Sequence, residues 1–327
     1  MRGAKSRVQR HPDDSRHRSG SALLFPTLAL RVWPTSRKRL GSLSTSEFPH
    51  RGEGTTSRDD LERILPRVIG HRGAAGCAPE NTLAGLRKAK ELRCRWAEFD
   101  VRLTADGQLI LLHDERLERT TNGRGKAALM PLATVRRYDA GHLFGNAFRG
   151  ERVPTFTEAV GVLGELGIGA NIELKAARGR AAETGAAAAA LISRMWPSHL
   201  PAPLVSSFLQ EALSTVRARA PSIARGLLFR SVPRNWHVYA QKLGCATIHA
   251  DHRCLHPALV AKIRDAGYPL LAYTVNDTAR AVALFSWGVT SVFSDVPYII
   301  CAAMSATRQP AIAKLSAAGA QRQGAAR

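Results

Sequence analysis

Residues 68–115 read VIGHRGAAGCAPENTLAGLRKAKELRCRWAEFDVRLTADGQLILLHDE, and this stretch decides the fold. It opens on a short apolar run that predicts a strand, the Pro-Glu-Asn-Thr turn at 79–82 opens a helix, and residues 96–102 predict a second strand. The Asp-Gly pair at 106–107 is typical of a tight hairpin turn, so residues 109–112 are expected to return antiparallel to the second strand. Strand alternating with helix is the pattern of a parallel sheet.

Polar side chains in this stretch lie at or near the ends of the predicted strands. His71 and Arg72 directly follow the first strand. Glu98 and Asp100 point to the same side of the second strand, because side chains alternate along a strand. With a two-residue hairpin turn, Asp100 lies opposite His113, and such partners are about 5 Å apart. We therefore expect two histidines, two carboxylates and an arginine to form one candidate catalytic site.

The alternation of strand and helix continues for about 235 residues and predicts eight strand-helix units. This size and rhythm fit a TIM (β/α)8 barrel with a small insertion after the second strand, at residues 115–154, above the barrel mouth. A doubly wound open sheet has the same rhythm, but it gives no reason for polar residues at so many strand ends. The candidate strands are 67–70, 96–102, 170–174, 204–207, 225–229, 246–250, 270–275 and 291–293.

Further polar residues follow the later strands. Glu173 and Lys175 end the third strand, Asn276 follows the seventh, and Ser294-Asp295 follows the eighth. The active site of a TIM barrel lies at the carboxyl ends of its strands. We therefore expect these side chains to converge with those of residues 71–113.

The ordered set of motifs resembles the signature of the glycerophosphodiester phosphodiesterases, over residues 67–302. The resemblance implies a TIM barrel that hydrolyses glycerophosphodiesters, such as glycerophosphocholine and glycerophosphoethanolamine, to sn-glycerol 3-phosphate and an alcohol. Tyr273 departs from the pattern, because the family usually has Trp there, and this bears on the shape of the substrate mouth. The motifs are His71-Arg72-Gly73, Pro79-Glu80-Asn81-Thr82, Glu98-x-Asp100, His113-Asp114, Asn171-Ile172-Glu173-Leu174-Lys175, Ser207-Phe208, Tyr273-Thr274-Val275-Asn276 and Ser294-Asp295-x-Pro297.

Three acids are candidate metal ligands: Glu98, Asp100 and Glu173. Carboxylates brought this close repel one another and need a counter-charge. All-oxygen ligation suits Mg²⁺ or Ca²⁺ rather than zinc, and the resemblance likewise implies a divalent cation at these positions. For Glu173 the alternative is a surface acid paired with Lys175.

His71 and His113 are the candidate general acid and base, because imidazole exchanges protons near neutral pH. The residues leave open which histidine plays which role. Arg72 and Lys175 are candidate phosphate-binding cations. The barrel also resembles phosphatidylinositol phospholipase C, so a cyclic phosphate intermediate formed by the glycerol 2-hydroxyl is one hypothesis.

Weaker candidates for the substrate pocket are Glu80, Phe208, Tyr273 and Asn276. Phe208 and Tyr273 fit a pocket wall and ordinary core packing equally well. Asn81 and Thr82 are expected to cap the first helix. Surface or structural roles are expected for His142, His237, His249, His252 and His256.

Composition limits the partners and the location of the protein. The net charge of +21 includes basic residues in an N-terminal extension, 1–64, and in a C-terminal tail, 303–327, which flank a catalytic domain at 65–302. The extension is expected to be disordered or to reflect an over-extended gene start, and the tail is expected to be flexible. A positive field attracts anionic substrates, although a generally arginine-rich composition accounts for the charge equally well. No apolar run is long enough to span a membrane, and no basic stripe interleaved with aromatic residues indicates nucleic-acid binding. Five cysteines without a CxxC pair favour reduced thiols and a cytoplasmic location.

Two rival functions follow from the same residues. A lysophospholipase-D-like enzyme would apply the same chemistry to lipids and would need an apolar groove near the insertion. A catalytically inactive barrel would serve as a binding module, with the basic termini as its working part. The oligomeric state has no signature in the sequence.

Overall fold

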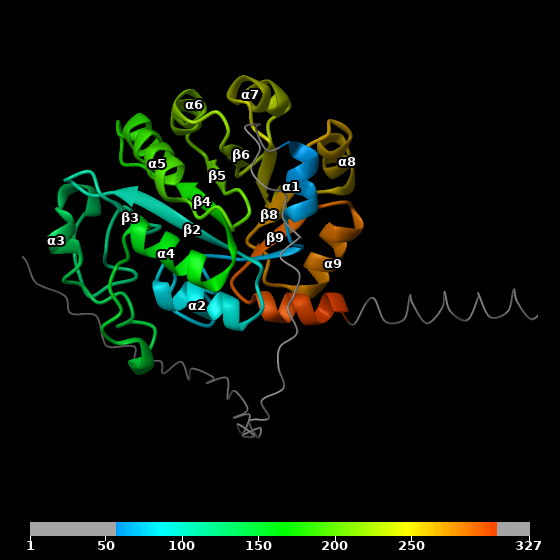
Figure 1. Cartoon of the computed structure of the whole chain (residues 1–327). Coiled ribbons are helices and arrows are strands. Elements are labelled where there is room, and N and C mark those ends of the chain that lie inside the picture. Colours follow the sequence, from blue (N-terminus) through cyan, green and yellow to red (C-terminus); the bar gives the residue numbers. More distant parts are fainter. Residues whose placement is uncertain (1–56, 306–327) are drawn as a thin grey trace, which may run out of the picture. The chain divides into compact units, whose positions relative to one another are not determined.

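The computed structural model describes residues 57–305 and shows a closed barrel (Figure 1). The barrel closes because the first strand pairs in parallel with both the last strand and the second strand. A TIM barrel is therefore confirmed. Its eight parallel strands are β1 (Val68–Gly70), β2 (Trp96–Leu103), β4 (Gly169–Leu174), β5 (Leu204–Ser207), β6 (Ala224–Phe229), β7 (Thr247–Asp251), β8 (Leu270–Tyr273) and β9 (Ser291–Ser294).

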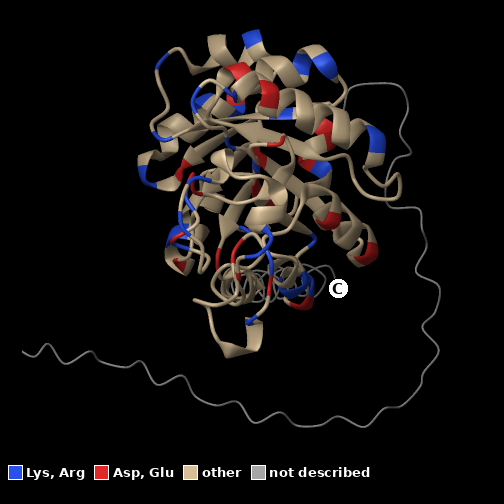
Figure 2. Cartoon of the chain, turned by 90° about the vertical axis from the view of Figure 1, so that its left-hand side faces the viewer, with Lys and Arg blue, Asp and Glu red and all other residues tan. Residues whose placement is uncertain are grey.

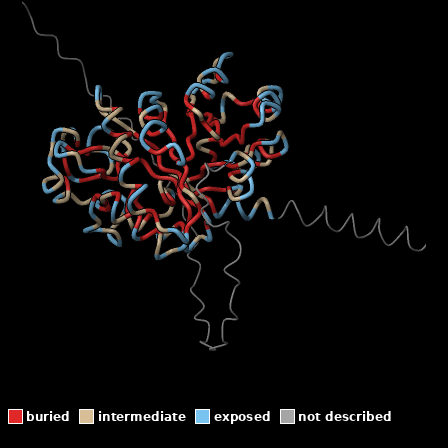
Figure 3. Tube along the Cα trace, turned by 45° about the horizontal axis from the view of Figure 1, so that its top comes forward, coloured by how far each residue is buried: buried red, intermediate tan, exposed pale blue. Residues whose placement is uncertain are grey.

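Helices cover the outside of the barrel (Figure 1), and the main core lies between them and the strands. Figure 3 shows buried segments in the interior of the fold and exposed ones at its periphery. Local capping sets where several of the helices begin: Thr82 and Thr155 accept hydrogen bonds from backbone N–H groups of the first turn. None of the helices in residues 57–305 is long and apolar enough to cross a bilayer. The covering helices are α2 (Leu83–Glu91), α4 (Phe156–Leu166), α5 (Ala181–Met195), α6 (Gln210–Arg219), α7 (Trp236–Leu243), α8 (Pro257–Asp265) and α9 (Thr278–Ser286).

The helix α1 (Arg58–Ile64) packs against the interior of the barrel. Leu61 is fully buried in a cluster with Ile69, Trp96 and Leu271, all of which point inward. Residues 58–64 were expected to belong to the N-terminal extension, so the folded part begins earlier than the predicted boundary at residue 65. Residues 303–305, expected in the tail, are helical. The rest of both predicted termini lies outside the described residues.

The hairpin after β2 differs from the prediction by one residue. The strand β3 (Leu109–Leu111) pairs with β2 so that Leu103 faces Leu109 and Val101 faces Leu111. Beyond these pairs the backbone N–H of Thr104 donates to the carbonyl of Gln108 at 2.9 Å, so the turn holds the three residues 105–107. Gly107 lies in the left-handed region at φ 74°, as in three-residue hairpin loops. Asp100 is level with Leu112 and not with His113, as the prediction had it.

The predicted insertion between β3 and α4 has a small core of its own. It contains η1 (Ala127–Leu129), α3 (Leu132–Val135) and η2 (Asn146–Phe148). Seven buried side chains hold it to the hairpin: Ile110, Leu112, Leu117, Ala127, Val135, Ala140 and Val153. Figure 2 shows basic and acidic residues interspersed on the face that this side of the molecule presents.

Candidate active site

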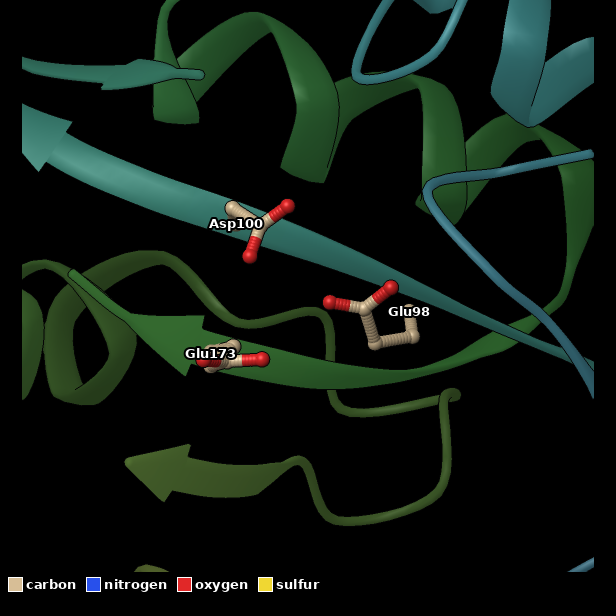
Figure 4. A group of neighbouring side chains, drawn as sticks. All are labelled: Glu98, Asp100 and Glu173. Atoms are coloured by element: carbon tan, nitrogen blue, oxygen red, sulfur yellow. The ribbon is translucent and has the colours of Figure 1, made fainter. Parts of the chain in front are cut away.

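Three buried carboxylates lie together inside the carboxyl end of the barrel (Figure 4). Glu98 and Asp100 come from β2 and Glu173 from β4, where Glu173 is the register partner of Asp100. One oxygen of each lies within 4.8 Å of the others, and the residues are 3%, 1% and 8% exposed. The sequence-predicted acidic cluster therefore forms in the structure.

The cluster carries more negative charge than the neighbouring cations neutralise. Lys175 Nζ lies 2.5 Å from Glu173 and 3.4 Å from Asp100, and Arg72 Nε lies 3.4 Å from Asp100. Burial would raise the pKa of Asp100, but these two cations hold it at about 2. Burial and the neighbouring carboxylates raise the pKa of Glu98 well above its usual range and that of Glu173 to about 7. This deficit of positive charge fits a site that takes a cation.

The donor set supports the same conclusion. Glu98 Oε1 is buried without a hydrogen-bond partner within residues 57–305. A buried charged oxygen without a partner is strongly unfavourable. Carboxylate oxygens from three residues suit a hard divalent ion such as Mg²⁺ or Ca²⁺. The residues present thus fit the ion that the sequence motifs imply.

Asp100 is held in place by Asn81 through two reciprocal hydrogen bonds. Asn81 Nδ2 donates to Asp100 Oδ2, and the backbone N–H of Asp100 donates to Asn81 Oδ1, both at 2.9 Å. Asn81 has φ 55°, a conformation that Asn adopts more readily than most residues. The helix cap is Thr82 alone, whose Oγ1 accepts from the N–H of Gly85 at 3.0 Å. The prediction that Asn81 caps the helix was therefore wrong.

His71 lies between a metal-ligand candidate and a second carboxylate. Its Nδ1 is 2.7 Å from Asp295 Oδ1, and its Nε2 is 3.8 Å from Glu98. Asn276 Nδ2 donates to Asp295 Oδ2 at 2.6 Å, and Asn276 Oδ1 accepts from the backbone N–H of Asp295 at 2.9 Å. Asn276 thus orients Asp295, which orients His71. Asp295 was expected to converge on the site because it follows the last strand, but no role was predicted for it.

His113 also pairs with a neighbouring carboxylate. Its Nδ1 lies 2.6 Å from Asp114 Oδ1, and Arg102 Nε donates to its backbone carbonyl at 2.9 Å. Burial lowers the pKa of His113 below its usual value. A carboxylate on one ring nitrogen sets the tautomer and leaves the other nitrogen to exchange protons.

Arg119, in the insertion, connects Glu80 to Asp114. Arg72 Nη1 donates to Glu80 Oε1 at 2.8 Å, and the backbone N–H of Arg72 donates to Glu98 at 2.8 Å. Arg119 donates to both oxygens of Glu80, at 2.7 and 2.8 Å, and to Asp114 Oδ2 at 2.7 Å. Arg119 was missed in the sequence, because no local pattern shows what an insertion side chain will contact.

These groups surround a central cavity of about 240 Å³. Glu80 and Asn276 are not among the residues that line it, and Asp100 lies just behind Arg72 and Lys175. The lining residues that sequence reasoning had singled out as site candidates are His71, Arg72, Glu98, His113, Glu173, Lys175, Phe208 and Tyr273. Lining residues without a predicted site role include Asn171, Arg230, His249, Asp251 and Arg253.

Phe208 and Tyr273 form part of the aromatic lining of the central cavity. Their rings meet edge to face, with centroids 6.0 Å apart, and the Tyr273 hydroxyl donates to the carbonyl of Phe229 at 2.7 Å. Asp251 is the last residue of β7 and Arg253 lies two residues further on, so the rule that active sites lie at strand ends was a signal that pointed to both.

A TIM barrel with three clustered acids, two histidines and two cations at the carboxyl ends of its strands belongs to the class of barrel enzymes. A family model described as the glycerophosphoryl diester phosphodiesterase family matches residues 71–299. The chain therefore belongs to that family, as its motifs indicated.

Individual relatives support the same assignment. The chain is 32% identical over 231 residues to a glycerophosphodiester phosphodiesterase of Caldanaerobacter subterraneus, covering 70% of this chain and 94% of that relative. A Bacillus subtilis glycerophosphodiester phosphodiesterase is 32% identical over 275 residues, covering 79% and 92%. A solved phosphodiesterase of Oleispira antarctica, in complex with the product sn-glycerol-3-phosphate, is 40% identical with a TM-score of 0.73 and covers 74% and 98%.

Proposed function

We propose that the protein hydrolyses glycerophosphodiesters, such as glycerophosphocholine and glycerophosphoethanolamine, to sn-glycerol 3-phosphate and an alcohol. The observation that carries the proposal is the convergence of the acidic cluster and both histidines on one cavity. The product bound in the Oleispira antarctica relative supports this substrate class. The complete set of reactive groups favours an active enzyme over the inactive binding barrel.

In this proposal His71 and His113 act as general acid and general base. Hydrolysis of a phosphodiester requires a nucleophilic oxygen to lose a proton and the leaving oxygen to gain one. Asp295 and Asp114 orient the two rings. The roles of the two histidines are assigned only as a pair.

Arg72 and Lys175 bind the phosphate in this proposal, because both cations line the cavity beside the acids. Glu98, Asp100 and Glu173 hold Mg²⁺ or Ca²⁺. The bound ion would act as a Lewis acid that stabilises negative charge on the phosphoryl group.

Metal dependence and substrate preference are tested together by the release of sn-glycerol 3-phosphate from several glycerophosphodiesters. EDTA should remove the activity, and Mg²⁺ or Ca²⁺ should restore it. Asp100→Asn should weaken the affinity for the ion about tenfold or more, measured by calorimetry, with the exposed Glu115→Gln as control. Full turnover of every diester in EDTA would contradict the metal-dependent mechanism.

A lysophospholipase-D-like activity is a second candidate, favoured by a hollow beside the insertion. This hollow of about 380 Å³ includes Leu103, Ala128, Leu129 and Ala177 in its lining, with Leu129 76% exposed. Arg102, which donates to the carbonyl of His113, also lines it, so it adjoins the site. Higher activity on lysolipid micelles than on glycerophosphocholine would favour this alternative.

We also propose a cytoplasmic location. All five cysteines are unpaired thiols in the structure, and proteins of reducing compartments rarely use disulfides. Loss of activity on transfer of the protein to an oxidising compartment would be consistent with this, whereas export of the native chain would contradict it.

A further inference from the structure

The floor of the central cavity holds two buried polar side chains that the proposed reaction does not use. Asn171 of β4 and His249 of β7 both line the cavity and are 1% and 0% exposed. Within residues 57–305, Asn171 Oδ1 and His249 Nδ1 have no hydrogen-bond partner. A buried polar atom left without a partner costs about 1–3 kcal/mol. A ligand in the cavity that forms hydrogen bonds with these two atoms would remove that cost.

The other polar atom of each side chain already has a hydrogen-bond partner. Asn171 Nδ2 donates to Ser206 Oγ at 2.9 Å, which directs the amide oxygen away from that contact. His249 Nε2 lies 2.9 Å from Thr247 Oγ1. The imidazole lies against Gly226, where an added Cβ would come within 2.6 Å of Nε2. Both orphaned atoms are therefore held in fixed directions by the barrel.

The two orphaned atoms complement a hydroxyl group. The amide oxygen of Asn171 can only accept a hydrogen bond. If Thr247 donates to Nε2 of the neutral imidazole, then Nδ1 of His249 carries the proton and donates. A hydroxyl can donate to the first atom and accept from the second. An apolar or ionised group would satisfy at most one of them.

The floor lies below the phosphate-binding level of the site. Asn171 and His249 each precede a rim residue by two positions, Glu173 and Asp251. Two residues along a strand span roughly 6.6 Å, the length scale of a glycerol arm. With the phosphate bound by Arg72 and Lys175, the terminal hydroxyl of the glycerol arm would extend toward Asn171 and His249 in the same cavity.

We propose that Asn171 and His249 form a hydroxyl-binding floor that receives the terminal hydroxyl of the glycerol arm. This inference rests on the proposed function. The floor selects glycerophosphodiesters over phosphodiesters whose reacting arm lacks that hydroxyl, because the two polar atoms would then remain unpaired.

The test compares two substitutions that preserve different ends of the imidazole. His249→Asn keeps an amide nitrogen near the position of Nδ1, whereas His249→Gln keeps one near Nε2. The substrates are glycerophosphocholine and its deoxy counterpart, in which propane-1,2-diol replaces glycerol. The wild-type protein should lose about 10- to 100-fold in kcat/KM on the deoxy substrate.

In His249→Gln, kcat/KM should fall by a similar factor on glycerophosphocholine and should change little on the deoxy substrate. His249→Asn should retain most of the discrimination between the two. If kcat/KM falls equally in both variants and on both substrates, His249 contributes only to packing and not to binding of the hydroxyl. Wild-type discrimination that neither variant alters would mean that other groups bind the hydroxyl and that the floor holds only water. Either result would overturn the proposal.

A binding measurement separates this inference from the proposed function. Calorimetry with sn-glycerol 3-phosphate and with propane-1,2-diol phosphate should show the same discrimination and the same loss in His249→Gln. If the wild type binds with this discrimination but hydrolyses no glycerophosphodiester, the proposed function fails and the floor stands. If the wild type hydrolyses glycerophosphodiesters but binds the two phosphates equally well, the hydroxyl-binding floor is contradicted and the proposed function stands.

Discussion

At the scale of single residues, the two candidate acid-base histidines, His71 and His113, are each oriented by a carboxylate on Nδ1. Asp295 holds His71 at 2.7 Å, and Asp114 holds His113 at 2.6 Å. The two carboxylates reach the site differently, since Asp295 follows the last strand and Asp114 is the chain neighbour of His113. The contact of His71 with Asp295 depends on barrel closure, whereas that of His113 with Asp114 depends only on local geometry.

His113→Ala should reduce kcat by at least about 10²-fold, because positioned general acids and bases contribute 10² to 10⁴. The side chain lies at the mouth of the barrel, so thermal unfolding should change little. The exposed His142 of the insertion provides the control substitution. Equal activity of the two alanine variants would remove His113 from the mechanism.

The buried His249 should make stability depend on pH. Burial lowers its pKa to about 3 in the folded protein, against about 6.5 in the unfolded chain. Between these values the unfolded state binds the additional proton, so His249 makes the free energy of unfolding fall as the pH falls. The slope contributed is at most about 1.4 kcal/mol per pH unit. Denaturant unfolding from pH 7 to pH 4 should show a shallower decline for His249→Gln than for the wild type, and parallel declines would contradict this.

At the scale of elements, the guanidinium of Arg119 connects the insertion to the candidate active site. Arg119 contacts Glu80 and Asp114, the partners of Arg72 and His113. Charge-assisted bidentate contacts of this kind fix geometry as well as adding energy. The insertion is therefore a positioning element and not only a wall around the barrel mouth.

Arg119→Gln should raise KM and lower kcat together, by about tenfold or more, because it releases both carboxylates. Arg116→Gln is a matched control, since Arg116 pairs with Glu118 in the same insertion and both lie outside the cavity lining. Added guanidinium should partly restore the activity of Arg119→Ala, because the native Arg119 side chain is 46% exposed and its position is therefore accessible from solvent. Equal kinetics in the two glutamine variants would show that Arg119 does not position the site.

At the scale of the whole molecule, α1 packs against the inward side chains of the barrel. Leu61 is fully buried against Ile69 and Trp96. Truncating a buried leucine to alanine typically costs 2–5 kcal/mol, because a cavity remains. The stability of the barrel thus depends on a helix that precedes the first catalytic motif.

Leu61→Ala should lower the free energy of unfolding by about 2–5 kcal/mol while leaving the KM of the folded enzyme unchanged. Urea unfolding followed by fluorescence measures the first quantity, and initial rates measure the second. Leu129→Ala, at a position that is 76% exposed, should change stability by less than about 0.5 kcal/mol. A similar stability for both variants would contradict a core role for α1.

The amino-acid sequence alone was enough to predict the order of strands and helices, the barrel class and the set of acids, histidines and cations. These follow from local periodicity and from the position of each polar residue after a strand, which neighbouring residues specify. Glu98 and Asp100 share a face in any strand, so their pairing needs no tertiary information.

The hairpin register and the hydrogen-bond partners of the site residues are established only in the folded barrel. The same Asp-Gly pair fits a two-residue or a three-residue turn, so the chain alone does not place Asp100 against Leu112. His71 and Asp295 are 224 positions apart and meet because the last strand pairs with the first. Arg119 and the hydroxyl-binding floor likewise depend on contacts between distant segments, which exist only once the barrel has closed.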